Sequence, residues 1–480
     1  MADTPQRDVA ASLRIRPPSP GTFLPADQRL RLAKGATLAR SGLAMSREPL
    51  KLANLNTASM AQVEAWCGGE PVGSAPQSQR LAMHLLAAGI LEEHVPSGSV
   101  DLATVTAVIA VRDDLDGLSG LMDYFSQLGV STVIVDDGSH DAHGVATVAA
   151  QATLIRHDYA RGPAAARNAG IRASLTPWVF LVDSDVDLKN FDLERFASWC
   201  QRDDAALIAP RVIGSQGRSL RERFDRRNSP LDLGPEPGRI GARKAINFVP
   251  SAAMLLRTGI LDAPFDETLL VGEDVDLVWR LEEAGWNLLY RPEYLVTHRT
   301  RATWSAWLTQ RYGYARAAAD LSERHGEQAA PVRGSALTIG AWVLLLSGYT
   351  TPAISLFSLS KRRLDASLIQ FDNDALSAII FAKAALRPGP RLARQLLRTY
   401  GLALLGGCLF SKRIRRLTFT AVLLGGIDRW WRSERDLDPL RFLAVSTLED
   451  LAYATGLSAG AVRRRSPKAL LPRLTWRSRS

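Results

Sequence analysis

The feature that most constrains the fold is a regular alternation of strand-like and helix-like segments between residues 105 and 182. Apolar runs rich in Val and Ile predict buried strands at 105–111, 132–135, 152–156 and 178–182. The segments between them carry apolar residues at helical spacing. Strands that alternate with helices predict an α/β domain with a mostly parallel sheet covered on both faces. In such sheets ligands bind beyond the carboxyl ends of the strands.

The composition changes on both sides of this domain. Residues 1–25 are rich in Pro and Ser, and we expect them to be disordered. Residues 26–97 hold two segments with helical spacing, the second ending at Gly89, and predict a small α+β module. We place the α/β domain at 102–330 and a helical C-terminal region at 331–480.

The charge and the cysteines narrow the class of protein. The formal net charge is +10, and much of the excess lies in short C-terminal basic runs such as 412–416. This distribution favours contact with an anionic membrane over DNA recognition, because no cluster of Arg, Asn and Gln on one helix is visible. Cys67, Cys200 and Cys408 lie far apart, without zinc or redox spacing, which favours a reducing compartment. Residues 1–22 contain no apolar core of signal-peptide length.

The helical region contains apolar stretches that suggest a membrane. Residues 334–360 are uncharged and long enough to span a bilayer, although glycines and a proline interrupt them. The shorter runs 399–411 and 417–427 favour interfacial amphipathic helices. We therefore expect the protein at the cytoplasmic face of the cell membrane. The alternative is a pair of helical hairpins packed against the enzyme.

Charged residues follow the predicted strands. Asp136 and Asp137 follow strand 132–135 in an Asp-Asp-Gly-Ser run, where a carboxylate can accept a hydrogen bond from a nucleobase. An ordinary turn is the alternative. Arg167 lies one turn into a helix that opens with Gly-Pro, and its planar fork suits a diphosphate. The alternative interpretation is that Arg167 is a surface arginine on an alanine-rich helix.

Two aspartates separated by one residue follow the strand 178–182. Asp183 and Asp185 supply the oxygen ligands that Mg²⁺ or Mn²⁺ prefers, together with substrate phosphates. The metal would stabilise the charge on a leaving diphosphate. His298, after the apolar run 294–297, is a candidate to complete this site. A polar loop and a structural histidine are the alternatives.

Three acidic residues crowd the start of a helix that ends at Gly285: Glu273, Asp274 and Asp276. Acidic residues are favoured at helix starts by the helix dipole, so capping is one explanation. Three acidic residues within four positions suggest a further role beyond capping. One of them near a sugar acceptor would remove the hydroxyl proton as attack occurs.

The order of these features resembles the inverting family 2 glycosyltransferases with the nucleotide-sugar-binding A-type fold. The shared order is Asp-Asp-Gly-Ser, Ala-Arg-Asn-x-Gly, Asp-x-Asp, Glu-Asp at a helix start, and a histidine. The resemblance covers about 104–325. The first strand departs from it, because it ends in Ala-Val-Arg-Asp in place of Pro and a Tyr-Asn-like pair. The Gln-x-x-Arg-Trp run of processive polysaccharide synthases is also missing.

The resemblance implies roles for the donor-binding residues. Asp137 would bind the uracil ring, with Asp136 supporting the turn. Arg112 would lie near the donor, although the departure in the first strand leaves its contacts open. Arg167 would lie beside the diphosphate, close to Asp183.

The resemblance also implies a metal-dependent reaction. Asp183 and Asp185 would hold Mg²⁺ or Mn²⁺, with Asp185 the direct ligand and His298 as a further contact. Asp274 would be the catalytic base. A single displacement would convert an α-linked donor into a β-glycoside.

A narrower resemblance is to the glycosyltransferases of the mycofactocin system. It rests on the N-terminal module, the catalytic segment, the run Arg311–Arg316 and the tail, and the Ala- and Arg-rich usage suits an actinobacterium. It implies transfer of glucose from UDP-glucose onto a peptide-derived redox cofactor precursor, with the module 26–97 as a peptide-binding part. The alternatives are a membrane-associated transferase of a cell-wall glycan or glycolipid, and a catalytically inactive sugar-nucleotide-binding scaffold.

Overall fold

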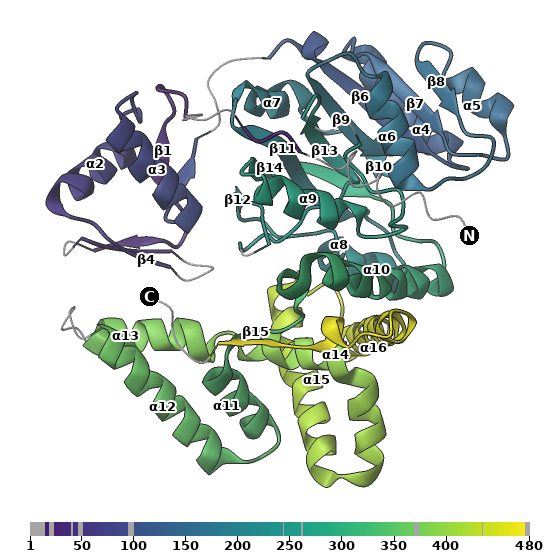
Figure 1. Cartoon of the computed structure of the whole chain (residues 1–480). Coiled ribbons are helices and arrows are strands. Elements are labelled where there is room, and N and C mark those ends of the chain that lie inside the picture. Colours follow the sequence, from purple (N-terminus) through teal and green to yellow (C-terminus); the bar gives the residue numbers. More distant parts are fainter. Residues whose placement is uncertain are drawn as a thin grey trace, which may run out of the picture. The chain divides into compact units, whose positions relative to one another are not determined.

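The computed structural model describes most of the chain, namely residues 15–18, 24–39, 42–46, 51–94, 100–242, 244–260, 263–368, 374–433 and 435–475. Most of the predicted disordered segment 1–25 lies outside the described residues. The chain divides into two compact units (Figure 1). Unit 1 is Met1–Ser215 with Ser229–Arg299, and unit 2 is Gln216–Asn228 with Thr300–Ser480.

A small α+β module forms the N-terminal part of unit 1. β1 pairs antiparallel with β5, and β2, β3 and β4 form an antiparallel sheet. The elements are β1 (Leu30–Leu32), β2 (Thr37–Leu38), β3 (Leu43–Met45), β4 (Leu52–Asn54), α2 (Thr57–Cys67), α3 (Pro76–Ala88) and β5 (Leu91–Glu93). Val63, Trp66 and Leu85 are buried in its core. Gly89 ends α3 in the left-handed conformation with φ 70°, as the sequence predicts.

A nine-stranded sheet forms the centre of unit 1, in the order β10-β14-β11-β13-β9-β6-β7-β8, with β12 beside β14. Its strands are β6 (Val105–Val111), β7 (Thr132–Asp136), β8 (Thr153–Arg156), β9 (Trp178–Asp183), β10 (Val186–Asp187), β11 (Ala205–Gly214), β12 (Gly238–Arg239), β13 (Ala253–Arg257) and β14 (Asn287–His298). The strands β8, β7, β6 and β9 are parallel neighbours, and they lie in the segment where alternating strands and helices were predicted. β13 runs antiparallel to both β9 and β11, so the sheet is mixed. β11 and β14 are parallel again, so it is the antiparallel pairs of β13, which need no crossover helix, that interrupt the alternating pattern in this half.

Helices pack around this sheet in unit 1: α4 (Leu115–Gln127), α5 (Ala142–Val148), α6 (Pro163–Ala173), α7 (Leu193–Ala197) and α9 (Glu273–Glu283). Phe125, Phe180 and Phe196 lie in the core between helices and sheet. α6 approaches β6 closely, because a Cβ at Gly170 would lie 2.3 Å from Cγ1 of Val108. The last glycine of the Ala-Arg-Asn-x-Gly run thus fixes α6 against the strand that leads to the rim.

Unit 2 is helical. Its helices are α8 (Leu220–Asn228), α10 (Trp304–His325), α11 (Ala336–Leu346), α12 (Thr350–Leu368), α13 (Asp374–Phe381), α14 (Gly389–Phe410), α15 (Lys412–Arg432) and α16 (Pro439–Arg463), and β15 (Arg333–Ser335) pairs in parallel with β16 (Arg473–Thr475). The sequence analysis placed the start of the helical region at 331, whereas unit 2 also includes residues 216–228 and 300–330, with α8 and α10. α10 packs against α16, where a Cβ at Gly456 would lie 2.2 Å from the carbonyl oxygen of Tyr312.

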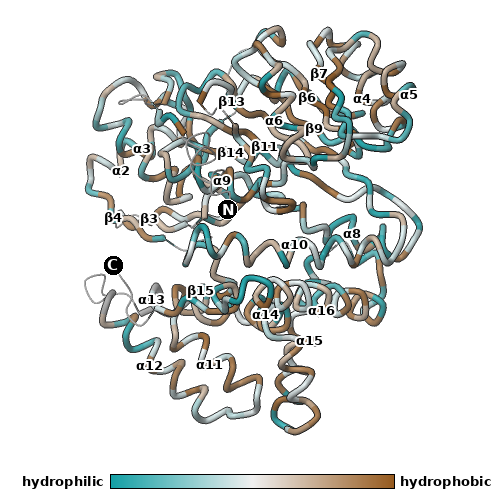
Figure 2. The backbone as a smooth tube through the Cα atoms, turned by 45° about the vertical axis from the view of Figure 1, so that its right-hand side comes forward, coloured by the Kyte–Doolittle hydropathy of each residue, from teal (hydrophilic) through white to brown (hydrophobic). Residues whose placement is uncertain are grey.

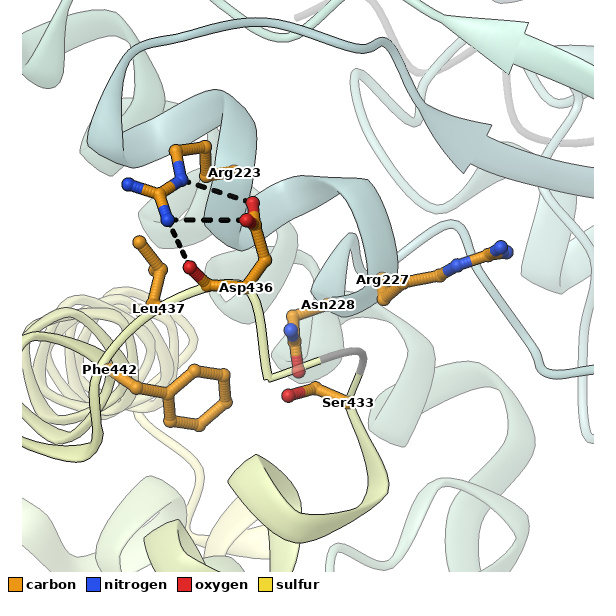
Figure 3. A pocket seen from close by; sticks show the side chains of 7 residues that line it. All are labelled: Arg223, Arg227, Asn228, Ser433, Asp436, Leu437 and Phe442. Atoms are coloured by element: carbon orange, nitrogen blue, oxygen red, sulfur yellow. Dashed lines mark hydrogen bonds and ion pairs between the residues drawn. The ribbon is translucent and has the colours of Figure 1, made fainter.

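A pocket between α8 and the segment that joins α15 to α16 shows how α8 is held within unit 2 (Figure 3). The Nε and Nη2 atoms of Arg223 donate to the carboxylate oxygens of Asp436 at 3.0 and 3.2 Å. In addition, the rings of Phe224 on α8 and Phe442 on α16 lie 5.1 Å apart between centroids. A charged fork and an aromatic contact therefore fix α8 to the C-terminal helices.

The stretch 334–360 forms two helices in place of one span. α11 ends at Leu346, Gly348 adopts φ 92°, and α12 starts at Thr350. α11 with α12, and α14 with α15, form two hairpins, as the alternative interpretation of the sequence expected (Figure 1). Within the described part of the chain, no helix combines the length and the apolar character needed to cross a membrane.

Candidate active site

The ends of three parallel strands bring the predicted donor-binding residues to one rim of the sheet. Val111 of β6 is paired with Asp136 of β7, and Ala110 is paired with Asp183 of β9. Because these strands are parallel and in register, their carboxyl ends lie at the same edge. Arg112, Asp137 and Asp183 therefore share this rim, although they are distant in the sequence.

The Asp-Asp-Gly-Ser run forms a tight turn at the end of β7. The carboxylate of Asp136 is buried, accepts from the backbone N–H of Ser139 at 2.8 Å, and forms an ion pair with Arg156. Gly138 adopts φ 76°, and a Cβ there would lie 2.7 Å from the backbone nitrogen of Ala160. The turn therefore requires glycine, and Asp136 stabilises it, as the resemblance implies.

Asp137 holds the loop that leads into α6. Its Oδ1 accepts from the backbone N–H of Arg161 at 2.8 Å and lies 2.7 Å from Nδ1 of His157. Its Oδ2 accepts from the backbone N–H of Gly162 at 2.8 Å. Both carboxylate oxygens thus have protein partners in this structure. His157, which directly follows β8, is a site residue that the sequence analysis missed.

Arg112 lies on the exposed side of the rim. It follows Val111, whose carbonyl accepts from the backbone N–H of Asp137 at 2.9 Å. Its Nε lies 3.7 Å from Oδ2 of Asp113, and 56% of its side chain is exposed. Asp113 has the unusual φ of 55°, and its Oδ1 lies 2.9 Å from Nδ1 of His140. The departure in the first strand therefore produces a charged, solvent-facing corner beside the turn.

Arg167 connects two acidic motifs. Its guanidinium is buried, with Nη2 donating to Asp183 at 2.6 Å and Nη1 donating to Glu273 at 2.8 Å. Burial lowers the pKa of Arg167, but attraction by Asp183 and Glu273 outweighs it and keeps the group charged. Arg167 thus neutralises carboxylates at the rim, among them Asp183 of the predicted metal motif, and its contact with a diphosphate stays a prediction.

The residue after Arg167 fixes the chain segment before α9. Nδ2 of Asn168 donates to the carbonyl of Phe265 at 2.8 Å, and Oδ1 accepts from the backbone N–H of Phe265 at 3.0 Å. Nδ2 also reaches Glu267 at 3.1 Å, and Arg161 reaches the same carboxylate at 3.1 Å. The sequence analysis assigned no role to Asn168 or Glu267. The polar Arg-Asn pair inside a short alanine-rich helix was the sequence feature that could have indicated a role for Asn168.

Asp274 lies at the start of α9, close to the Asp-x-Asp motif. Its Oδ2 accepts from the backbone N–H of Ser251 at 3.3 Å, and the next carbonyl, of Ala252, accepts from the backbone N–H of Asp183 at 3.0 Å. Asp274 and Asp183 are therefore joined through the segment 251–252 and, by way of Glu273, through Arg167. Burial, and then repulsion by Glu273, raise the pKa of Asp274 to about 7.

Asp185 and His298 meet at the other side of the motif. β10 pairs with the end of β14, so that Val186 lies opposite His298. Nε2 of His298 lies 3.2 Å from Oδ1 of Asp185. Arg299, which the sequence analysis missed, donates its backbone N–H to the carbonyl of Asp185 at 2.9 Å and pairs with Asp114.

Asp185 and His298 could supply some of the ligands of a divalent cation. Across the residues that the structure describes, no three His, Cys, Asp or Glu side chains gather into a group able to hold a metal. Asp185 and His298 are in contact, whereas Asp183 pairs with Arg167. A cation that also binds substrate phosphates needs only one or two protein carboxylates, so this pair fits the chemistry of such an ion.

Comparison with known proteins identifies the class. Residues 125–262 match the family model described as Glycosyl transferase family 2. Over 414 residues the chain is 32% identical to a curated protein of Mycobacterium tuberculosis, covering 83% of this chain and 87% of the relative. The chain therefore belongs to glycosyltransferase family 2, and it is a glycosyltransferase with an α/β catalytic fold.

The relatives in M. tuberculosis, from strains CDC 1551 and H37Rv, carry the name Pre-mycofactocin glycosyltransferase. The chain is also 30% identical over 202 residues to the succinoglycan biosynthesis protein ExoO of Rhizobium meliloti, covering 39% of this chain and 58% of that protein. The narrower resemblance seen in the sequence thus points to the same group of enzymes as the full-length relatives.

Solved structures show a more distant likeness. A mannosyltransferase from Pyrobaculum calidifontis, solved in complex with GDP-Man and Mn²⁺, shares 14% identity with a TM-score of 0.40, covering 75% of this chain and 87% of that one. TarS 1-349 from S. aureus shares 12% identity with a TM-score of 0.35, covering 75% and 92%. At these TM-scores the likeness does not bear on substrate or metal.

Proposed function

We propose that the protein transfers glucose from UDP-glucose, in β-linkage, onto a peptide-derived redox cofactor precursor of the mycofactocin type. The observation that carries the proposal is the convergence of Asp183, Glu273 and Asp274 around Arg167 at one rim of the sheet. The relatives named for pre-mycofactocin glycosylation support the acceptor class.

The donor would lie along the rim formed by β6, β7 and β9. Asp137 and the exposed Arg112 flank the place where a nucleobase would enter, and His157 positions Asp137. A uracil N–H would then compete with the backbone N–H groups of Arg161 and Gly162 for the carboxylate. Donor binding would therefore loosen the loop before α6 and change the position of Pro163 and Arg167 behind it.

Asp274 would act as the catalytic base. The acceptor oxygen attacks the anomeric carbon, the bond from that carbon to the phosphate oxygen breaks, and its electron pair leaves with UDP. The acceptor proton passes to the carboxylate of Asp274. A base with a pKa of about 7 is ionised in a large fraction at neutral pH and still accepts a proton strongly. One displacement inverts the anomeric carbon, so an α-linked donor yields a β-glycoside.

Mg²⁺ or Mn²⁺ would be held by Asp185 and His298, with Asp183 nearby. When bound, the ion would neutralise charge that develops on the departing diphosphate. The role of Arg167 would be to limit the repulsion among Asp183, Glu273 and Asp274 and to hold α9 against the Asp-x-Asp motif. The module 26–97 would bind the peptide part of the acceptor, a proposal that rests on the resemblance alone.

Product analysis tests this function. The purified full-length protein would be incubated with a panel of UDP- and GDP-sugars and with either the cofactor precursor or a lipid acceptor. We expect a mass increase of one hexose on the precursor with UDP-glucose, and a β-configured anomeric proton by NMR. Treatment with EDTA would abolish transfer, and Mn²⁺ or Mg²⁺ would restore it. Transfer to the lipid acceptor alone would overturn the proposed acceptor, and no transfer to any acceptor would support the scaffold reading.

A further inference from the structure

The distal part of the α14–α15 hairpin in unit 2 carries an exposed face without charge. Leu409 and Phe410 are 77% and 89% exposed, and Leu402 and Leu405 are exposed on the preceding turns of α14. Positions 402, 405 and 409 lie on one side of a helix. The exposed residues between them are Ala403 and Gly406, so no polar side chain interrupts this face. Figure 2 shows hydrophobic colour along this end of the hairpin.

Cations follow the apolar face directly. Lys412, Arg413, Arg415 and Arg416 are all exposed and occupy the first turns of α15. Positive side chains are unfavourable at a helix N-terminus, because the helix dipole is positive there. No Asp or Glu occurs between Asp374 and Asp428 to offset them. Their position therefore does not serve the stability of α15.

The turn of the other hairpin lies beside this one. The guanidinium of Arg413 lies 4.7 Å from the ring centroid of Tyr349, and Oγ1 of Thr420 donates to the carbonyl of Leu346 at 3.0 Å. The turn between α11 and α12 thus lies next to the same cations as the tip of the α14–α15 hairpin. We use the name apolar–basic face for Leu402, Leu405, Leu409, Phe410, Lys412, Arg413, Arg415 and Arg416.

We infer that the apolar–basic face docks the protein onto the surface of a bilayer that contains anionic phospholipids. The leucines and Phe410 would enter the boundary between headgroups and acyl chains, and the cations would bind headgroup phosphates. This mode requires no spanning helix, and no described helix is long and apolar enough to span a bilayer. A second copy of the chain fits less well, because a two-fold contact would bring four cations against four cations.

Vesicle flotation of the full-length protein tests this inference without reference to catalysis. We expect flotation with vesicles of phosphatidylcholine and phosphatidylglycerol, little with phosphatidylcholine alone, and release at high salt. Leu409→Ser with Phe410→Ser would weaken binding about tenfold or more. Lys412→Ser with Arg415→Ser would weaken it about 25-fold at low salt, since each cation near the surface contributes about 1 kcal/mol, which is about fivefold.

A matched control separates this face from general hydrophobicity. Leu440 and Val462 of α16 are 79% and 77% exposed, so Leu440→Ser with Val462→Ser removes similar apolar area elsewhere in unit 2. We expect this double variant to float like the wild type, and thermal melts would show that each variant is folded. The inference is overturned if the wild type fails to float, if the control loses as much binding, or if neutral vesicles bind equally well. It is also overturned if light scattering shows a dimer that Leu409→Ser with Phe410→Ser dissociates while vesicles bind neither form.

Discussion

Two buried clusters of charge, one in each unit, use the same residue types in opposite proportion. In unit 1, three carboxylates, from Asp183, Glu273 and Asp274, surround the single guanidinium of Arg167. In unit 2, Glu449 lies 2.6 Å from Arg429, 3.0 Å from Arg394 and 3.6 Å from Arg311. Acid is in excess around Arg167, and arginine is in excess around Glu449, although Asp225 and Asp450 also pair with two of these arginines.

The proportion decides what burial does to each carboxyl. Burial raises the pKa of Glu449, but the surrounding arginines outweigh it and lower the pKa to about 2. Burial raises the pKa of Asp274, and Glu273 adds to the increase, so that it reaches about 7. Glu449 is therefore ionised at every physiological pH and acts as a structural centre. Asp274 can exchange a proton near neutral pH, which is the property that a catalytic base needs.

The difference between a carboxyl with a lowered pKa and one with a raised pKa also occurs within a single unit. Glu93, at the end of the N-terminal module, lies 2.5 Å from Arg202, 2.6 Å from Arg291 and 3.2 Å from Arg239. Burial raises the pKa of Glu93, but these arginines lower it to about 2. Unit 1 thus contains both a glutamate held ionised by arginines and the aspartate that we propose as the base, and the number of arginines around each separates them.

The largest expected effect is on catalysis at Asp274. Asp274→Asn keeps the shape of the side chain but removes the base, so kcat should fall about 100- to 10,000-fold. Donor affinity, measured by titration with UDP-glucose, should change little. Glu283→Gln, at the exposed far end of the same helix, is the control and should retain activity. Near-normal turnover by Asp274→Asn would rule out the assigned base.

Removing the structural glutamate of unit 2 should act on stability. Glu449→Gln removes the carboxylate that Arg311, Arg394 and Arg429 share, although Arg311 still pairs with Asp225 and Arg394 with Asp450. The free energy of unfolding should therefore fall by about 3 kcal/mol. Urea denaturation followed by circular dichroism measures this loss. If the variant is as stable as the wild type, the arginines are hydrated enough that Glu449 is not a structural centre.

Arg167→Gln should change the pH dependence of transfer. The wild-type rate should rise as the pH passes about 7, where Asp274 loses its proton. The guanidinium of Arg167 lowers the pKa of Asp274, so its removal should shift the rise of the rate to higher pH by about one unit. Arg167→Lys keeps a positive charge and should shift the rise less. If the rate of Arg167→Gln rises at the same pH as that of the wild type, the charge of Arg167 does not affect the pKa of Asp274.

The smallest effect concerns stability against pH, where Glu93 and Asp274 have opposite signs. The pKa of Asp274 is raised from 3.8 to about 7, so the folded state loses stability as the pH rises through this window. Asp274→Asn should therefore melt at a higher temperature than the wild type at pH 8, with a smaller difference at pH 5.

The pKa of Glu93 is lowered from 4.5 to about 2, so its contribution to stability is present above pH 4.5 and lost as the pH falls toward 2. Glu93→Gln should reduce the loss of stability on acidification, measured by thermal melts between pH 5 and 2.

Local pattern was enough for the parallel half of the sheet. The strands at 105–111 and 178–182, and the helix that starts at Glu273, occur where apolar spacing predicts them. The strand ends also located the rim, because parallel strands end together. The antiparallel strand β13 was not predicted, since its position between β9 and β11 depends on pairing across the sheet.

The sequence by itself determined the chemistry that is present: the paired aspartates, the acidic helix start, the histidine and an arginine within reach of them. Tertiary structure decided which charges face one another. Arg167 meets Asp183 and Glu273, Asp185 meets His298, and Glu449 meets three arginines. A pKa depends on burial and on charges a few ångströms away, and these distances are set by segments more than 100 residues apart, such as 167 and 273. The division between a reactive and a structural carboxylate is therefore a property of the folded protein.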